Sequence, residues 1–211
     1  DAKRLAARAA AQRKLIADNL WDDRGGIFTN RFWNGSFYRR VSPTSFYAML
    51  ARAATDEQAA AMVSNWLLSP DHFCIAPEGD MAGNSDSCWW GLPSIEASDP
   101  AYPPLGYWRG YVWGPMAQLT YWSLQQYDHV PIVRKGRKAL CKQMAALMLD
   151  EWRRNRHICE NFNPHRNATE CSGTKFYHWG ALNGMITMVE EGWYSEEALE
   201  EATPPVRSPS P

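Results

Sequence analysis

The sequence lacks any long hydrophobic run. Across its 211 residues, no stretch approaches the roughly 20 uninterrupted apolar residues that a membrane-spanning helix needs. The Ala- and Arg-rich N-terminus also lacks the apolar block of a signal peptide, although an upstream leader could have been removed. We therefore expect no membrane span and a chain that is soluble as it stands.

A dominant charge of one sign is also missing. The formal net charge is -1 and the pI is about 6.6, so the chain has no broad positive field to attract nucleic acid or anionic membranes. Two short cationic runs, 134–138 and 153–156, are interpreted as solvated helix faces. With 45% apolar residues, the chain can bury the core of one large domain or two small ones.

The cysteines and histidines form no CxxC or HExxH pair. The five cysteines can be paired as Cys74 with Cys88 and Cys159 with Cys171, which leaves Cys141 unpaired in a helix. A zinc site is an alternative, but it needs Cys159 and Cys171 as free thiols. Its ligands would come from His157, Cys159, His165, Cys171 and His178. We expect no metal and no cofactor.

Two glycosylation sequons begin at Asn34 and Asn167. About one is expected by chance in a chain of this composition, so the signal is modest. Taken with the cysteine pairs, the sequons favour a secretory or luminal compartment over the cytoplasm.

Strand-like alternation is rare, whereas helical periodicity recurs in long segments. The sequence therefore predicts an all-α fold. A short hairpin is expected between 26–29 and 36–39, around the turn Trp33-Asn34-Gly35. The predicted helices cover residues 2–20, 43–54, 55–68, 115–127, 131–156 and 175–191.

Between residues 69 and 110 lies a long segment rich in Pro, Gly, Ser and Asp. Loops of this length usually serve a site or a partner. The Pro- and Ser-rich tail, 203–211, is predicted to be disordered.

Eleven tryptophans are the compositional anomaly. Some belong to the core, but indoles also line sugar-binding clefts. The run Tyr107-Trp108-Arg109-Gly110-Tyr111-Val112-Trp113 sets aromatic faces beside a guanidinium, and Glu160 follows on a turn-rich segment. Aromatic rings, a hydrogen-bonding fork and a carboxylate are what glycoside hydrolysis requires.

Five motifs in order, together with a helix start at Tyr177-His178-Trp179-Gly180, resemble glycoside hydrolase family 63 and its trehalase relatives. The helix start is similar to the branch that includes mannosylglycerate and glucosylglycerate hydrolases. The resemblance covers roughly Trp21 to Trp193. The five motifs are Val41 to Tyr47, Gly91 to Ser94, Asp99 to Tyr102, Tyr107 to Met116 and Glu160 to Pro164.

The resemblance implies an (α/α)6 barrel and an inverting mechanism, in which one carboxyl group protonates the leaving oxygen and another activates water. By matching position, Glu160 is the general base; the alternative is a solvated loop glutamate. The substrate would be a terminal α-mannosyl or α-glucosyl glycoside.

The resemblance also implies sugar-binding residues. Arg109 would hydrogen-bond sugar hydroxyls, while Trp108 and Trp113 would wall the pocket; alternatively these are core aromatics covering an Arg stem. The remaining candidates for substrate contact are Tyr107, Tyr177, His178 and Trp179. A His at a helix start is more often structural.

Two further carboxylates, Glu96 and Asp99, lie in the long loop. Either could bind a hydroxyl or cap a turn. For Asp99, capping ranks first because Asp-Pro favours turns.

The family's general acid is an aspartate upstream of the matching region, and it has no counterpart here; Asp22 and Asp23 stand in different surroundings. We therefore expect residues 1–202 to be the C-terminal part of the catalytic domain, pairing with an N-terminal half from the same gene or a partner chain. The alternative is a sugar-binding remnant that cleaves nothing. A bridge between Cys159 and Cys171 would pin Glu160 in place.

Overall fold

The structure, a computed structural model, describes residues 1–75, 91–103, 105–165 and 171–193. Helices dominate these residues, as the sequence predicts. The helical elements are α1 (Ala2–Leu20), the 3-10 turn η1 (Pro43–Phe46), α2 (Tyr47–Leu50), α3 (Asp56–Met62), the π-helical η2 (Val63–Leu67), α4 (Gly114–Gln125), α5 (Pro131–Asn155) and α6 (His178–Glu190). The strands are β1 (Trp21–Asp22), β2 (Ile27–Phe28), β3 (Asn30–Arg31), β4 (Phe37–Tyr38), β5 (Cys159–Asn161) and β6 (Ser172–Lys175).

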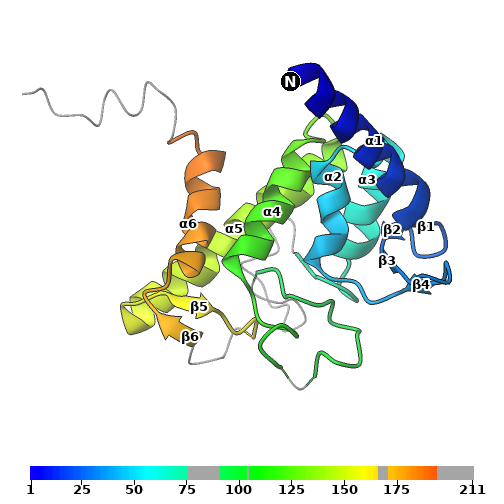
Figure 1. Ribbon diagram of the computed structural model, residues 1–211. Helices are drawn as coiled ribbons and strands as arrows, with labels where there is room; N and C mark the ends of the chain where they lie inside the picture. Colours follow the sequence, from blue (N-terminus) through cyan, green and yellow to red (C-terminus); the bar gives the residue numbers. More distant parts are fainter. Residues whose placement is uncertain (76–90, 104, 166–170, 194–211) are drawn as a thin grey trace, which may run out of the picture.

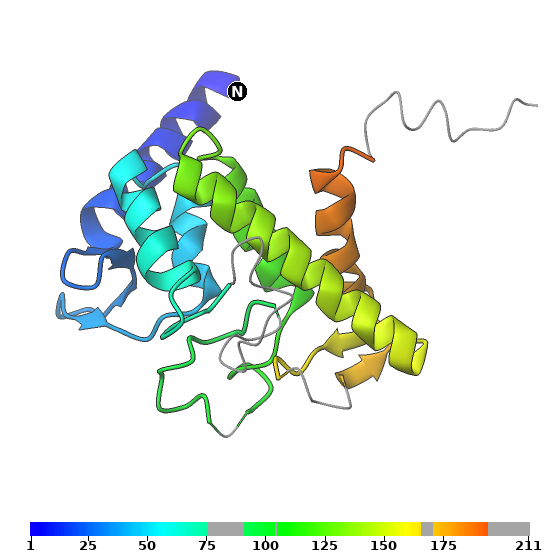
Figure 2. The ribbon, with the colours of Figure 1, turned by 180° about the vertical axis from the view of Figure 1, so that it is seen from behind.

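The helices stand in a curved row, with α1 at one edge and α6 at the other (Figure 1). Seen from behind, α5 crosses the back of the row and reaches the β5–β6 hairpin (Figure 2). The loops and short strands collect at one end of the helices. The core lies between the helices, and its largest fully buried side chains include Phe46, Phe73, Trp113, Tyr121 and Phe162.

Local chemistry explains the helix boundaries. Thr55 caps α3 in a capping box, because its hydroxyl accepts from the Gln58 N–H while the Gln58 side chain accepts from the Thr55 N–H. Pro115 and Pro131 lie in the first turns of α4 and α5, where the missing N–H costs nothing. Helix α5 ends at Arg156, whose left-handed conformation (φ 56°) stops the helix.

The N-terminal hairpin is different from the predicted one. Strand β4 pairs with β3, while β2 pairs with β1, so the segments 26–29 and 36–39 are not partners. The reason is a second turn at Asp22–Gly26, closed by bonds from the N–H groups of Gly25 and Gly26 to the Asp22 carbonyl. The Asp22 carboxylate accepts from Arg39, and this bond lowers the pKa of Asp22.

The last helix begins at His178 rather than at residue 175. Residues 172–175 instead form β6, whose partner is β5. The predicted tail, 203–211, lies outside the described residues. No helix in the described ranges is long and apolar enough to cross a bilayer.

Candidate active site

Glu160 occupies the middle of β5, which is held from both sides. On one side β5 pairs with β6. On the other, Val112 and Phe162 exchange two backbone hydrogen bonds of 2.8 and 3.0 Å. This second pairing brings the aromatic run at 107–113 next to Glu160 across 53 residues of sequence.

The Glu160 carboxylate has two hydrogen-bond donors. The Tyr107 hydroxyl donates to Oε1, and the Thr174 N–H lies 3.4 Å from Oε2. The bond to Glu160 raises the pKa of Tyr107, because removing the phenolic proton would place two anions in contact. Tyr107, predicted as a sugar-binding residue, is therefore a direct partner of Glu160.

A glycine faces the other side of this carboxylate. Gly173 in β6 has φ +80°, and a Cβ at this position would collide with Oε2 and Cβ of Glu160. A side chain at Gly173 is therefore excluded both by the backbone conformation and by the proximity of Glu160.

Aromatic rings pack beside Tyr107. Trp108 stacks on Trp113 with centroids 3.8 Å apart, and Trp179 meets Trp113 edge-on at 5.7 Å. The Trp113 indole N–H donates to the Tyr107 carbonyl at 2.9 Å. Trp113 is fully buried, whereas Trp108 is 47% exposed and Tyr107 50% exposed. Trp113 thus supports the exposed rings from behind.

Arg109 lies between these rings in sequence and is exposed. Its backbone closes a tight turn with Gly106 through two 2.9 Å hydrogen bonds. Its guanidinium lies against Gly106, and the described residues form no ion pair with it. Its predicted role in sugar binding stays a prediction.

The start of α6 reaches the same cluster. Tyr177 occupies the N-cap position without a side-chain capping bond, and its ring meets Trp179 edge-on at 5.4 Å between centroids. His178 is exposed, and its ring centroid lies 4.7 Å from that of Tyr177. Gly180 permits the approach, since a Cβ there would collide with the Cys159 carbonyl. The three predicted residues are thus placed beside β5.

Two buried amides were not singled out by sequence reasoning. The side chains of Asn161 and Asn183 are fully buried and lack a hydrogen-bond partner within the described part of the chain. A buried unpaired amide costs roughly 1–3 kcal/mol. Asn161 follows Glu160 directly in β5, but it is fully buried whereas Glu160 is partly exposed, since successive side chains of a strand point to opposite faces.

The loop carboxylates are both engaged. Asp99 pairs with Arg40 at 2.8 Å and accepts from the Ala101 N–H, which confirms turn capping. Glu96 accepts from His72 Nδ1 at 3.0 Å and from Ser98. Both side chains are buried, so neither is offered to a sugar.

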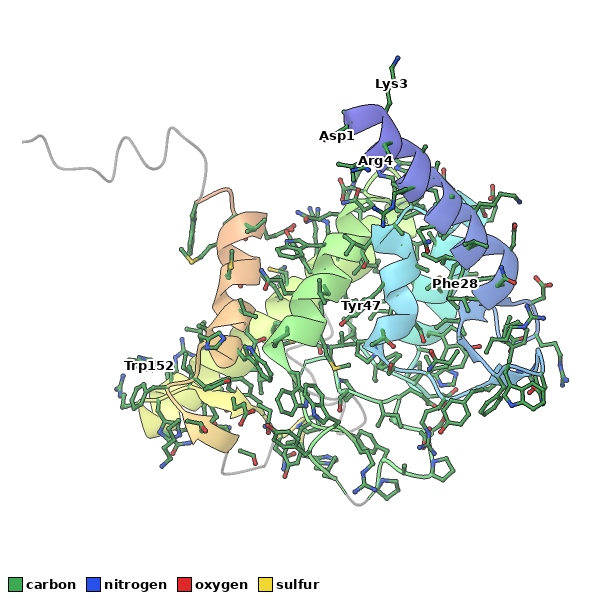
Figure 3. The ribbon with its side chains drawn as sticks, viewed as in Figure 1. Asp1, Lys3, Arg4, Phe28, Tyr47 and Trp152 are labelled. Carbon is green, nitrogen blue, oxygen red and sulfur yellow. A yellow bond between two sulfur atoms is a disulfide. The ribbon has the colours of Figure 1, made fainter. Side chains whose placement is uncertain are left out.

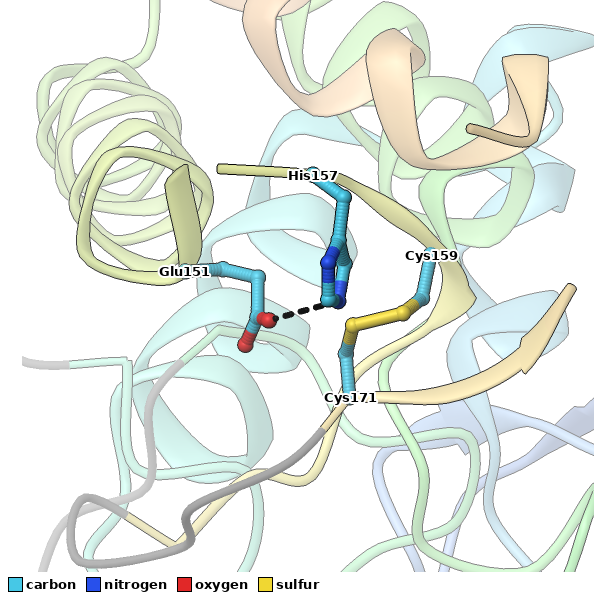
Figure 4. Close-up of side chains that lie close together, drawn as sticks. All are labelled: Glu151, His157, Cys159 and Cys171. Carbon is cyan, nitrogen blue, oxygen red and sulfur yellow. Dashed lines mark ion pairs between the residues drawn. A yellow bond between two sulfur atoms is a disulfide. The ribbon is translucent and has the colours of Figure 1, made fainter. Parts of the chain in front are cut away.

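The predicted bridge between Cys159 and Cys171 is present, with their Cα atoms 5.7 Å apart, and it ties the start of β5 to β6 (Figure 4). In this oxidised state Cys159 and Cys171 cannot serve as zinc ligands, because a disulfide supplies no thiolate. Cys141 is free, as predicted, and it is buried in α5. Cys74 is disulfide-bonded, and its predicted partner Cys88 lies outside the described residues.

The comparisons with known proteins show the family and the fold. Residues 1–180 match the family model of the mannosylglycerate hydrolase MGH1-like glycoside hydrolase domain. Mannosylglycerate hydrolases MGH1 and MGH2 of Selaginella moellendorffii are each 23% identical over 129 residues, covering 59% of this chain and 23% of theirs.

The fold is shared with solved glycosidases. The family 63 mannosylglycerate hydrolase of Thermus thermophilus, in complex with glucose, superposes with a TM-score of 0.58 at 18% identity, over 80% of this chain and 36% of that one. Neutral trehalase of Saccharomyces cerevisiae gives a TM-score of 0.59 at 21% identity, over 89% of this chain and 30% of that one. The chain thus has the fold of part of an (α/α)6 barrel and spans about a quarter to a third of these relatives.

Proposed function

Because the chain belongs to the mannosylglycerate hydrolase MGH1-like family, within glycoside hydrolase family 63, we propose that it carries the general base of an inverting glycosidase. The bond cleaved is a terminal α-mannosyl or α-glucosyl bond of a small glycoside, such as mannosylglycerate or glucosylglycerate. The observation that carries the proposal is the Glu160 carboxylate, held by Tyr107 beside the exposed ring of Trp108.

In this mechanism, ionised Glu160 accepts a proton from a water molecule as that water attacks the anomeric carbon. An acid on the opposite face protonates the leaving oxygen, so the product has the inverted configuration. The Tyr107 hydroxyl donates to Oε1 and so fixes the orientation of the carboxylate, which keeps further lone pairs to accept from water.

Sugar recognition is assigned to the aromatic rings beside this carboxylate and to Arg109 of the same run. The half-exposed Trp108 offers an apolar face to the C–H groups of a sugar. Arg109 offers a fork of donors to hydroxyls. Tyr177, His178 and Trp179 border the same region from α6 and complete the proposed wall.

The general acid is proposed to come from a second part of the barrel. Helix α6 supports this idea. Its buried residues form the stripe Gly180, Asn183 and Ile186, whereas its apolar side chains outside that stripe are only partly covered or exposed; these include Ala181, Leu182, Met185 and Met188. An apolar helix face normally packs against another element.

The uncovered face of α6 borders a groove of about 580 Å³ against the second half of α5. Trp152 projects at its end and is 44% exposed (Figure 3). The groove is lined by Met148, Leu149, Trp152, Ile158, Ala181, Leu182, Gly184, Met185 and Met188. At the opposite edge of the row, α1 buries none of its residues. We assign both edges to the helices that complete the barrel.

Turnover tests the proposal. The protein, as the longest product of its gene, is incubated with mannosylglycerate, glucosylglycerate and glucose-terminated oligosaccharides. Glu160→Gln should lower kcat by about 100-fold or more, the usual contribution of a positioned base. Glu191→Gln, a matched change at the exposed end of α6, should not. Sugar binding without turnover in the unsubstituted protein would instead identify a binding module.

A further inference from the structure

Four metal-ligand side chains converge at the end of α5, apart from the aromatic run. They are Glu151 in the last turn of α5, His157 in the following loop, Cys159 in β5 and Cys171 before β6, hereafter the Glu151 cluster. One donor atom from each lies within 4.8 Å of the donor atoms of the others. Figure 4 shows the imidazole and the carboxylate both turned toward the two sulfur atoms.

The polar members of the cluster are withdrawn from solvent. The side chains of Glu151 and His157 are 7% and 15% exposed, and Nε2 of His157 lies 3.3 Å from Oε1 of Glu151. Asn155 donates to the same carboxylate at 2.6 Å, and the His157 ring meets Phe176 edge-on. A disulfide offers neither group a strong hydrogen-bond partner, so a carboxylate and an imidazole are buried against an apolar bridge.

We propose that the Glu151 cluster binds one Zn²⁺ when the Cys159–Cys171 disulfide is reduced. A dithiol reductant supplies two electrons and two protons, the S–S bond breaks to give two thiols, and the reductant becomes a disulfide. Binding of Zn²⁺ then releases the two thiol protons to solvent. The ligand set is two thiolates, the imidazole and the carboxylate, a combination of donors that zinc accepts.

The geometry requires only small movements. Zinc lies about 2.3 Å from thiolate sulfur and about 2.0–2.2 Å from imidazole nitrogen or carboxylate oxygen, which sets tetrahedral donors roughly 3.3–3.8 Å apart. The four donors are already within 4.8 Å of one another. Once the bond between them is broken, the two sulfurs need only separate to the tetrahedral spacing.

The metal would replace one cross-link by another. The disulfide joins β5 to β6, and zinc held by Cys159 and Cys171 would join the same two strands. The inference concerns metal binding alone and does not depend on the proposed glycosidase activity.

Metal titration tests the inference. The intact chain is reduced anaerobically with a phosphine, freed of reductant, and titrated with Zn²⁺ against a chromophoric chelator; Co²⁺ is used in parallel. We expect one metal per reduced chain and none per oxidised chain. Bound Co²⁺ should show a thiolate charge-transfer band and tetrahedral d–d bands.

Variants identify the ligands. His157→Ala and Glu151→Gln should each weaken binding at least tenfold, whereas His129→Ala, an exposed histidine outside the cluster, should not. Reduction also opens the bond of Cys74, so its thiol is a competing ligand. If zinc is bound by the Glu151 cluster, Cys74→Ser should leave the stoichiometry unchanged. Circular dichroism checks that each variant is folded.

Several results would overturn the inference. These are a reduced wild-type chain that binds no metal, a Co²⁺ complex without a thiolate band, and binding that survives His157→Ala unchanged. The Co²⁺ spectrum of Cys74→Ser, which keeps all four proposed ligands, decides the matter even if a ligand variant fails to fold.

Discussion

At the scale of single residues, the proposed base depends on three neighbours with different tasks. Tyr107 donates to its carboxylate, Thr174 offers a backbone N–H, and Gly173 leaves room for it. From the sequence we predict Glu160 as the base but expect Tyr107 to contact the sugar. The contact between them depends on the pairing of Val112 with Phe162, which no local pattern reveals.

The first prediction concerns Tyr107→Phe. The change removes a hydrogen bond to a charged group, which contributes about 1.5–3 kcal/mol, while the ring remains. We expect kcat to fall roughly tenfold to a hundredfold with a smaller change in KM. Tyr38→Phe, in the N-terminal hairpin, is the control. A raised KM with unchanged kcat would mean that Tyr107 contacts only the sugar.

The second prediction separates backbone strain from contact with Glu160. Gly173 and Gly192 have φ values of +80° and +72°, but only at Gly173 would a Cβ meet another residue. Gly173→Ala and Gly192→Ala should both lower stability, by about 1 kcal/mol for the unfavourable φ alone. Only Gly173→Ala should also lower kcat. Equal kcat in the two variants would show that Gly173 does not position Glu160.

At the scale of elements, several helix starts could be predicted from capping residues in the sequence, whereas the strand pairs could not be predicted from local sequence. Pro115, Pro131 and the Thr55 capping box mark helix starts in the sequence, and the structure places them there. The strands have at most four residues, so their pairing depends on turns and on tertiary contacts rather than on alternation. With one turn between β1 and β2 and another between β3 and β4, the N-terminal segment forms two strand pairs instead of the single predicted hairpin. Residues 172–175 form β6, so the last helix begins three residues later than predicted.

The third prediction concerns the cross-link of β5 to β6. Reduction of the Cys159–Cys171 bond, with a chelator present to exclude zinc, should lower turnover while the far-UV spectrum of the helices persists. The bridge closes a loop of 12 residues and should contribute about 3 kcal/mol, mainly by restricting the unfolded chain. In the native oxidised protein both cysteines should resist alkylation. Free alkylation of both thiols would contradict the account.

At the scale of the whole molecule, the curved row of helices has two open edges. The family and the barrel fold were predictable from the sequence, because five motifs stand in the order of a known family. Which residues of α6 remain exposed was not predictable, because an apolar helix face does not show in the sequence which element it packs against.

The fourth prediction concerns this face. Leu182→Lys places a charge in the groove between α5 and α6, where the side chain is only partly covered. We expect little change in the melting temperature of the chain alone but loss of assembly with the remainder of the barrel, measured by light scattering. Lys135→Glu, on the exposed part of α5, is the control. Unchanged assembly in Leu182→Lys would place the contact elsewhere.

The most direct test of the central claim is the anomeric configuration of the sugar released by the longest product of the gene, followed by NMR with Glu160→Gln alongside. The account predicts an initially inverted product and its loss in the variant. A retained configuration, or turnover that persists in Glu160→Gln, would contradict the assignment of Glu160 as the base.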